Sequence, residues 1–214
     1  TARELYKEIK KYKKDIQINP SLILSQLQQD LIVGSTIGDG TIKQRNLNCH
    51  FRVEHSQKQE HYLKWKFNIL KEFTSSDIKN YEKISHEKQT KFYYFLTLTH
   101  PAFNFYRKLF YKNSIKTISE DILSLLNPQS LAIWVCDDGS YCKKQHYLIL
   151  CTNSYTLEEH KIIKKYFEEN WNLNPTIGFR DKKYYYLRFK VEDTKKLISI
   201  IKPFIPKGME YKIG

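Results

Sequence analysis

Apolar residues recur along the chain with a spacing that changes between helical and strand periods. Between residues 21 and 37, apolar side chains stand at 22, 23, 24, 27, 31, 32, 33 and 37, which predicts a helix with a broad buried face. Asn19 and Pro20 precede it as a cap and a first helical residue, and Gly38-Asp39-Gly40 ends it. Residues 47–54 then alternate and predict a strand, whose buried side should carry Leu47, Cys49, Phe51 and Val53.

The same succession of patterns occurs twice. Helical spacing over 60–73 is followed by strand patterns near 78–84 and 91–98 and by a helix over 101–111. A second cap, Asn127-Pro128, precedes a buried helix through 131–136 that ends at Asp137-Asp138-Gly139. A strand at 146–152, a helix from 157 to 170 capped by Thr156, strands at 176–180 and 183–190, and a helix near 192–202 complete the pattern. Each half therefore has the predicted order α-β-β-α-β-β-α, an internal repeat of about 100 residues.

The repeat predicts an α+β fold made of two pseudo-symmetric halves. We assign residues 20–126 to the first repeat and 127–214 to the second, after an N-terminal extension over 1–19 that is basic and weakly amphipathic and is expected to form a leading helix. The two buried helices carry small residues spaced i, i+4, which permit close approach of backbones. We expect these helices to pack against each other through Gly34 with Gly38 and Ala132 with Cys136.

The charge balance indicates what kind of partner the protein binds. The chain of 214 residues has 36 basic and 23 acidic side chains, a net charge of +13. Such an excess predicts a polyanionic partner, with nucleic acid first and an acidic membrane surface second. A content of 41% hydrophobic and 14% aromatic residues excludes a disordered tail protein. No apolar run approaches the roughly 18 residues of a spanning helix, so a membrane protein is excluded too.

The cysteines indicate a reducing compartment. None of the four forms a CxxC pair, and their spacing does not match a zinc site. We expect them to be buried free thiols in an intracellular protein, either in the cytoplasm of a prokaryote or in a mitochondrion or chloroplast. The four are Cys49, Cys136, Cys142 and Cys151.

Two acidic residues occupy equivalent places in the repeats. Asp39 and Asp138 stand 99 residues apart, and each follows an apolar helix and precedes a glycine. One such residue would be an ordinary Asp-Gly turn. A carboxylate at a helix C-terminus faces the negative end of the dipole, and a divalent cation would offset that cost. If the helices pack together, the two carboxylates emerge side by side, an arrangement suited to Mg²⁺-assisted hydrolysis of a phosphodiester.

These helix ends resemble the motif of the LAGLIDADG homing endonucleases, in the branch with two repeats in one chain. The first copy is Ile32-Val33-Gly34-Ser35-Thr36-Ile37-Gly38-Asp39-Gly40, and the second is Leu131-Ala132-Ile133-Trp134-Val135-Cys136-Asp137-Asp138-Gly139. Residues 99–103 and 127–134 also resemble this family's entry into the second repeat, and residues 201–206 and 209–212 resemble the single-chain mitochondrial intron enzymes. The resemblance covers residues 20–214. It implies a monomer whose sheets form a saddle and which cuts both strands of double-stranded DNA at a long recognition site.

The resemblance also implies roles for particular residues. Asp39 and Asp138 would bind Mg²⁺, with Mn²⁺ as a second ion that supports cleavage. The backbone carbonyls of Gly38 and Asp137 would complete the metal site. A basic residue of each repeat would lie near the scissile phosphate, and the matching positions, 77 and 74 residues after the two acids, are Lys116 and Lys212.

The sequence departs from the family pattern at a few positions. Ser119 stands where this branch often has proline, and Asp137 adds an acid beside Asp138. Ile133 and Trp134 are bulky where the motif has Gly and Leu, so the second helix is expected to pack differently. A polar residue that organises water is expected on the first strand region, where the candidates are Glu54, His55 and Gln57.

Strands with one polar face can lie in the major groove of DNA, where base edges are distinguishable. In both repeats, polar and basic residues alternate with apolar ones along a predicted strand. The predicted DNA-contacting residues are Arg45, Asn48, His50, Arg52, Tyr184, Tyr186, Arg188 and Lys190.

Two alternatives to the endonuclease use the same basic surface. An RNA-binding maturase would assist folding of its host intron, and a catalytically silent protein would bind DNA without cutting it. The presence of both Asp39 and Asp138 favours cleavage. Enzymes of other classes are disfavoured because no GxxxxGK[ST] loop, HExxH or GxSxG motif occurs.

Overall fold

The computed structural model describes residues 23–85 and 88–214, which divide by contacts into two compact units. Unit 1 takes the described residues up to 28 together with 41–108, and unit 2 takes residues 29–40 together with 109–214. The predicted leading helix over residues 1–18 lies outside the described residues. The units follow contacts rather than sequence symmetry, so the division into repeats 20–126 and 127–214 stays a prediction.

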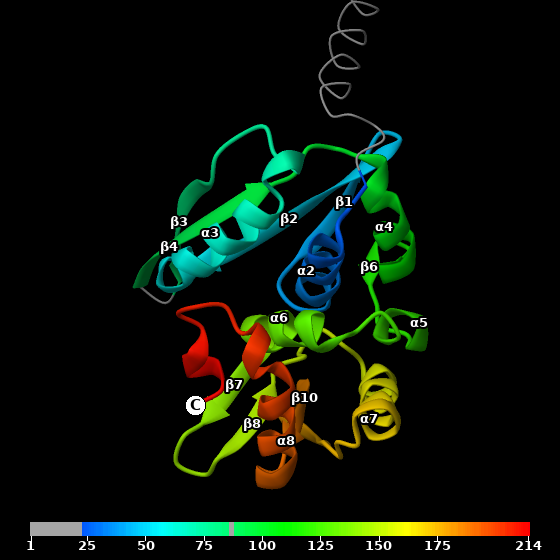
Figure 1. Ribbon diagram of the computed structural model, residues 1–214, viewed down its shortest axis with the longest axis vertical. Helices are drawn as coiled ribbons and strands as arrows, with labels where there is room; N and C mark the ends of the chain where they lie inside the picture. Colours follow the sequence, from blue (N-terminus) through cyan, green and yellow to red (C-terminus); the bar gives the residue numbers. More distant parts are fainter. Residues whose placement is uncertain (1–22, 86–87) are drawn as a thin grey trace, which may run out of the picture. The chain divides into compact units, whose positions relative to one another are not determined.

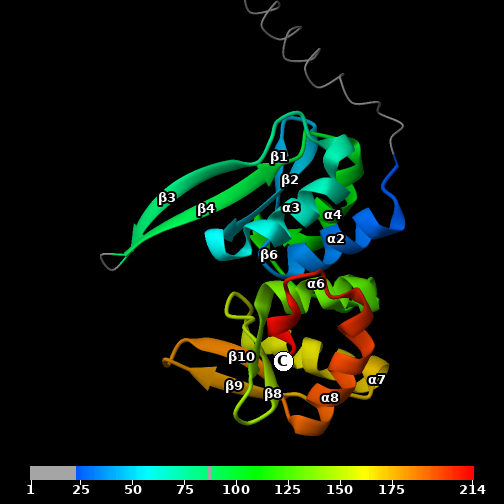
Figure 2. The same cartoon turned by 60° about the vertical axis from the view of Figure 1, so that its left-hand side comes forward.

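Unit 1 is built on a four-stranded antiparallel sheet in the order β1-β2-β4-β3 (Figure 2). The strands are β1 (Thr41–Arg45), β2 (Asn48–Ser56), β3 (Lys79–Ser85) and β4 (Lys88–Leu96). Helix α3 (Glu60–Ile69), between the short turns η1 (Gln57–Gln59) and η2 (Lys71–Phe73), packs on β2 and β4. After β4, the turn η3 (Pro101–Phe103) leads into α4 (Asn104–Phe110).

The predicted alternation of β2 is confirmed except at its start. Cys49, Phe51 and Val53 are buried. Leu47, which was expected beside them, is 81% exposed because it lies in the tight turn between β1 and β2, where Asn46 takes a φ of 58°. The pattern was correct for the strand and extended one residue too far.

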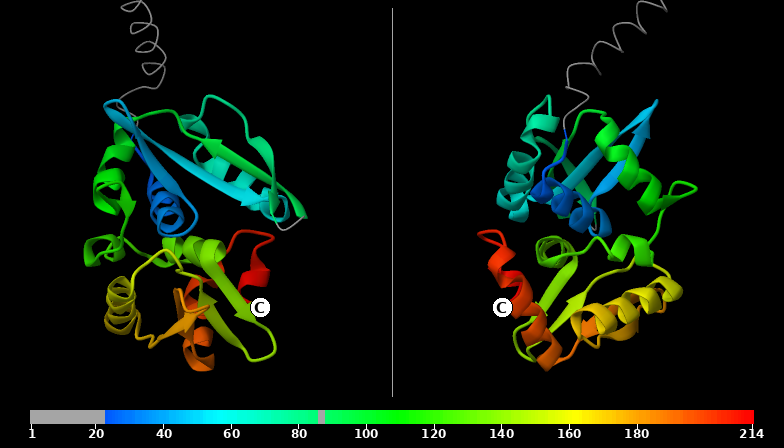
Figure 3. Two further views of the ribbon diagram at one scale, coloured as in Figure 1. Left: turned by 180° about the vertical axis from the view of Figure 1, so that it is seen from behind. Right: turned by 45° about the vertical axis from the view of Figure 1, so that its right-hand side comes forward.

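Unit 2 repeats the arrangement, with a four-stranded antiparallel sheet in the order β7-β8-β10-β9. Figure 1 labels β7, β8 and β10 of this sheet, and Figure 3 shows the same ribbon from two further sides. The strands are β7 (Gly139–Cys142), β8 (Tyr147–Leu150), β9 (Thr176–Arg180) and β10 (Tyr184–Phe189). Helices α7 (Leu157–Trp171) and α8 (Val191–Ile201) pack on this sheet. The remaining elements of the unit are β5 (Tyr111–Lys112), β6 (Ile115–Lys116), α5 (Glu120–Leu123), α6 (Pro128–Asp138), η4 (Lys202–Phe204) and η5 (Glu210–Lys212).

The predicted order α-β-β-α-β-β-α is confirmed in both halves, because each sheet has a helix before its first strand, between its strand pairs and after its last strand. Helix α7 begins directly after Thr156, whose side chain forms a capping box with Glu159. Helix α2 (Gln26–Ile37) begins later than expected, and Ile23 is 85% exposed rather than buried. The hairpin β5–β6 and helix α5 were not predicted.

Two further expectations can be compared with the structure. All four cysteines are free, as predicted, and Cys49 and Cys136 are buried. The prediction of burial is wrong for Cys142 and Cys151, which are partly exposed at the end of β7 and directly after β8. Within residues 23–85 and 88–214, none of the helices has the length and apolar character needed to cross a membrane.

Candidate active site

Unit 2 contains the end of α2 and the whole of α6, and the two helices meet at glycines. A Cβ atom at Gly34 would lie 2.3 Å from the carbonyl oxygen of Ser130 and 2.9 Å from Cβ of Ile133. A Cβ atom at Gly38 would lie 2.7 Å from Cβ of Asp137. Both positions therefore require glycine, and the predicted close approach of the two helices is confirmed.

The face of α6 at this contact differs from the expected one. The atoms nearest to the two glycines belong to Ser130, Ile133 and Asp137, and not to Ala132 or Cys136. Ile133 fills the space that Gly34 leaves, which accounts for a bulky residue where the family motif has glycine. The capping box between Asn127 and Ser130 fixes where α6 begins.

The carbonyl groups at the two helix ends bind the predicted lysines. Lys116 Nζ donates to the carbonyl oxygen of Gly38 at 2.7 Å. Lys212 Nζ donates to the carbonyl oxygens of Asp137 at 3.2 Å and Gly139 at 2.9 Å. Each lysine therefore lies at the helix end of its own motif. Ammonium groups here satisfy carbonyls that a helix leaves without partners and suit the negative end of its dipole.

Tyr155 is a buried residue of this site that sequence reasoning missed. Its hydroxyl donates to the carbonyl oxygen of Ile37, the last residue of α2, at 2.7 Å. Burial and the nearby acids Asp138 and Glu159 raise the pKa of this hydroxyl, so it stays a donor. The tyrosine follows β8 by several residues, and no local pattern connects it with a helix end 118 residues earlier.

Three carboxylates gather at the helix ends. Asp39 is exposed, Asp137 is buried and Asp138 is partly buried. Carboxylate oxygens of Asp39 and Asp137 lie within 4.8 Å of each other. The carboxylate of Asp138 accepts a hydrogen bond from Trp134 Nε1 at 3.0 Å. Desolvation and the charges of Asp39 and Asp137 raise the pKa of Asp138 to about 8.

The charges at this site fit a divalent cation. Desolvation lowers the pKa of Lys116, while Asp138, Asp39 and Asp137 act in the opposite direction. The available ligands are carboxylate and carbonyl oxygens, the donors that Mg²⁺ and Ca²⁺ prefer. Three acids that crowd one another at two helix C-termini are costly without a counter-charge. The donor set and its electrostatics therefore suit the predicted metal site.

The candidates for organising water all lie in or just after β2. Glu54 stands on the polar face and binds Arg52 at 2.6 Å and Tyr81 at 2.9 Å. His55 is on the buried face, with its ring 5.0 Å from that of Tyr62. Gln57 begins η1. Glu54 is thus held in a side-chain network, whereas His55 is buried beside Tyr62.

The four predicted DNA-contacting residues of unit 1 share one face of its sheet. Arg45 pairs with Asn48 across β1 and β2, and His50 and Arg52 follow on the same face of β2. Desolvation, then the charges of Arg45, Lys43 and Arg52, lower the pKa of His50. Arg52 lies 4.3 Å above the ring of Tyr94. The side-chain oxygen of Asn48 already accepts a hydrogen bond from Asn104 at 2.9 Å.

Unit 2 has a similar polar face. Tyr184, Tyr186 and Arg188 alternate along β10, and Arg188 lies 4.0 Å above the ring of Tyr147. Lys190 does not lie on the strand: it is the N-cap of α8. Arginine stacked on tyrosine of a neighbouring strand thus occurs in both sheets. The sequence analysis missed both tyrosines, because strand register decides which residues meet.

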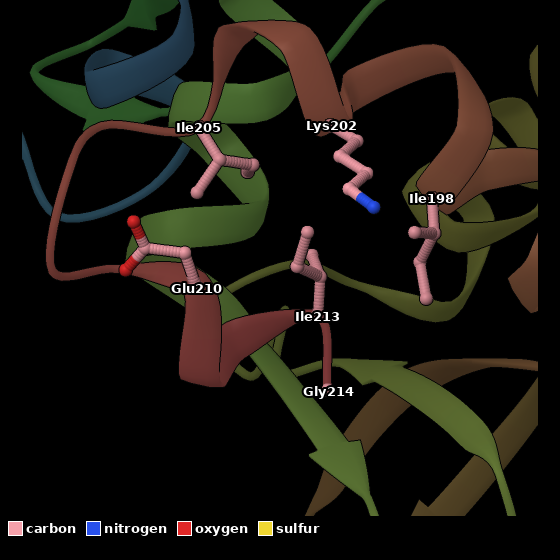
Figure 4. Close-up of a pocket in the computed structure, with 6 residues that line it drawn as sticks. All are labelled: Ile198, Lys202, Ile205, Glu210, Ile213 and Gly214. Carbon is pink, nitrogen blue, oxygen red and sulfur yellow. The ribbon is translucent and has the colours of Figure 1, made fainter.

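A small pocket of unit 2 lies beside the last residues rather than at the acids. It is lined by Ile198, Lys202, Ile205, Glu210, Ile213 and Gly214 (Figure 4). The amine of Lys202 points into the pocket, and the carboxylate of Glu210 is turned away from it (Figure 4). The lining is largely apolar and includes none of the three acids, so we do not assign the chemistry to this pocket.

Comparison with known proteins gives consistent results. Residues 29–197 match the model of the LAGLIDADG DNA endonuclease family. The chain is 28% identical to DNA endonuclease I-ChuI of Chlamydomonas applanata over 215 residues, which cover 89% of the chain and 96% of that protein. It is 29% identical to cytochrome b mRNA maturase bI2 of Debaryomyces hansenii over 209 residues, which cover 94% of the chain and 79% of the maturase.

A solved structure has the same fold. The homing endonuclease I-WcaI bound to its DNA recognition sequence matches with a TM-score of 0.83 and 26% identity, over 96% of the chain and 92% of I-WcaI. The predicted fold class is confirmed by this match.

Proposed function

The chain belongs to the LAGLIDADG DNA endonuclease family, and on that premise we propose that it is a homing endonuclease that cuts both strands of a long double-stranded DNA site. The observation that carries the proposal is the pair of equivalent helix ends, each with an acid and the lysine of its own motif. Both motif copies lie in one chain, so the protein acts as a monomer. The similarity to I-WcaI, whose structure contains its DNA recognition sequence, supports double-stranded DNA as the partner.

The chemistry divides between the acids and the lysines. A divalent cation, Mg²⁺ or Mn²⁺, supplies Lewis acidity and lowers the pKa of an attacking water when bound. Asp39 and Asp138 would hold the cation, and the carbonyl oxygens of Gly38 and Asp137 would be further donors. Lys116 and Lys212 place positive charge beside the acids, where negative charge develops on the phosphate.

The polar faces of the two sheets bind the DNA in this proposal. Arg52 and Arg188 are held in fixed orientations by tyrosine rings, and a guanidinium can contact guanine through two hydrogen bonds. The exposed lysines contact phosphates, which position the protein without specifying sequence.

The direct test uses purified protein, Mg²⁺ and a randomised DNA duplex library, with sequencing of the cut ends. We expect one family of related sites, with one cut in each strand, and no cutting after chelation of the metal. Sedimentation of the active protein should give the mass of a single chain, 25.7 kDa. Cut ends without any shared sequence would contradict site-specific cleavage.

Lys116→Ala and Lys212→Ala should each slow cleavage on the order of 100-fold or less. A point charge near the phosphate assists a metal without replacing it, so its loss is milder than loss of a metal ligand. Single-turnover cleavage of the identified site measures the effect. Lys195→Ala is the matched control, because Lys195 is an exposed lysine of α8 that binds Glu192. Equal losses of cleavage rate in all three variants would contradict a specific role of Lys116 and Lys212 and would indicate a general effect of net charge.

DNA affinity should fall steeply with salt. Each phosphate contact contributes about −0.9 to the slope of log affinity against log salt concentration, because binding releases counterions. A protein with a net charge of +13 and two polar sheet faces should make more than two such contacts. Titration by fluorescence anisotropy in Ca²⁺ measures the slope, and a value shallower than about −2 would contradict an extended phosphate footprint.

A maturase that binds its host-intron RNA is the second candidate. The observation that favours it is the similarity to the maturase of Debaryomyces hansenii. Cleavage remains the better-supported function, because both acids and both lysines are present, which also argues against a silent DNA-binding protein. A splicing assay with an intron-containing transcript separates the two activities, because assisting RNA folding requires binding but no hydrolysis. We therefore expect a maturase to keep its splicing activity in Asp39→Asn and Asp138→Asn.

A further inference from the structure

The carboxylate of Asp138 is anchored by a side chain of its own helix. Trp134 stands one turn earlier on α6, and its Nε1 donates to Oδ2 of Asp138 at 3.0 Å. The indole is fully buried and stacks on Phe167, with ring centroids 5.9 Å apart and an interplanar angle of 20°. The donor therefore has a fixed position, and it fixes one oxygen of the carboxylate.

The other motif copy has a short side chain at this position. Ser35 stands four residues before Asp39, as Trp134 stands four before Asp138. Its hydroxyl is buried and has no hydrogen-bond partner in the part of the chain that the structure describes. Asp39 is exposed, whereas Asp138 is partly buried. The two acids thus stand at equivalent positions of the repeats but have different surroundings.

We propose that Trp134 is a positioning residue that orients the Asp138 carboxylate for the divalent cation, so that the two acid sites differ in metal affinity and in the rate at which they cut. The proposal rests on the proposed function. The indole N–H binds Oδ2 and restricts rotation of the carboxylate, so Oδ1 would be the oxygen that the cation takes. Hydrogen-bond partners behind a metal ligand commonly contribute 10–100-fold in metal affinity or activity.

The first test is spectroscopic and needs no cleavage. The chain has three tryptophans, so an ¹⁵N–¹H spectrum shows three indole N–H signals, and Trp134→Phe identifies one of them. Asp138→Asn should shift the Trp134 signal and leave those of Trp65 and Trp171 in place. Titration of the DNA complex with Ca²⁺ should move the same signal. A Trp134 signal that responds to neither change would overturn the proposal.

The second test separates the two strands. Trp134→Phe keeps an aromatic ring beside Phe167 and removes the N–H. We expect cutting of one strand to fall about 10–100-fold relative to the other and to recover at higher Mg²⁺ concentration. Ser35→Ala, at the equivalent position, and Trp171→Phe, which removes an indole elsewhere in unit 2, should leave the ratio of the two cuts unchanged. An unchanged ratio in Trp134→Phe would overturn the proposal.

A purely structural effect of Trp134→Phe is recognised by a double-mutant cycle. Ca²⁺ affinity of the DNA complex is measured by calorimetry for Trp134→Phe, Asp138→Asn and the double variant. If Trp134 acts through Asp138, its replacement lowers affinity in the wild-type background and not in the Asp138→Asn background. Equal losses in both backgrounds would refute the positioning role. If the proposed function itself is wrong, the result is different, because the wild-type protein and the Trp134 variant then both cut no DNA.

Discussion

Asp39→Asn and Asp138→Asn should each reduce double-strand cleavage by several orders of magnitude while DNA binding survives. Asparagine keeps the shape of the side chain but removes the charge that anchors the metal, and without the metal neither the attacking water nor the leaving oxygen is stabilised. Binding should persist or tighten, because the polar sheet faces are unchanged and a negative charge near phosphate is lost. Cleavage in Mg²⁺ and a gel shift in Ca²⁺ measure the two effects separately.

Asp137→Asn is the matched control, because Asp137 is adjacent to Asp138 and its carboxylate lies within 4.8 Å of that of Asp39. We assign the metal to Asp138 because it directly precedes Gly139, as Asp39 precedes Gly40, so Asp137→Asn should cost less. Near wild-type cutting by Asp39→Asn and Asp138→Asn would place the metal site elsewhere. Loss of binding together with cutting would make the two acids structural residues of the helix ends.

The pH dependence of the stability of Asp138→Asn tests the raised pKa of Asp138 without measuring cleavage. Burial and the neighbouring acids raise the pKa of Asp138 from 3.8 to about 8, so the metal-free folded protein keeps a proton there that the unfolded chain has lost. The free energy of unfolding should therefore fall as the pH rises from about 4 to about 8. The asparagine variant should lose less stability over this range. Thermal melts in chelator at several pH values measure the difference.

Gly34→Ala should destabilise the protein by about 3 kcal/mol, the upper end of the usual cost of overpacking. The added Cβ would lie 2.3 Å from a backbone oxygen of Ser130 and 2.9 Å from Cβ of Ile133, and a backbone atom cannot rotate away. For a chain of this size the melting temperature should fall by about 6–12 °C. A helical glycine replaced by alanine normally gains about 1 kcal/mol, so the sign of the effect is itself informative.

Gly178→Ala is the control for this prediction. Its added Cβ would meet the far end of the Tyr186 side chain, at 2.2 Å from Cζ, and that ring can turn aside. We expect a smaller loss of stability there than at Gly34. A melting temperature of Gly34→Ala equal to or above that of the wild type would show that α2 and α6 do not pack as closely as described.

Local signals in the sequence predicted helix starts well. Thr156 and Asn127 cap α7 and α6 where expected, because a capping side chain and the backbone it binds are three residues apart. The start of α2 was predicted too early, since Ile23 matches helical spacing and yet lies before the helix and is exposed. The hairpin β5–β6 was missed because each of its strands has two residues, too few for a period.

The residues of the candidate site that stand at equivalent positions of the two repeats could be predicted from the sequence. Asp39 and Asp138 were found by their equivalent spacing in the two repeats, whereas Lys116 and Lys212 were assigned from the family resemblance. The structure brings each lysine to the end of its motif helix. Which face of α6 meets α2 was predicted wrongly, because several small residues compete in the sequence and only packing selects among them. Trp134 could have been found, since a donor four residues before an acid lies on the same helix face.

The network around Arg52 bears on how such a protein acquires a new target. Arg52 binds Glu54 at 2.6 Å, stacks on Tyr94, and shares Glu54 with the hydroxyl of Tyr81. If this face binds DNA as proposed, replacing Arg52 alone would leave the carboxylate of Glu54 next to the DNA without its cation, so neighbouring residues of three strands must change with it. Arg188 has a simpler setting on Tyr147 and forms no ion pair with a carboxylate of residues 23–85 or 88–214. A change of target sequence is therefore easier to select through unit 2 than through unit 1.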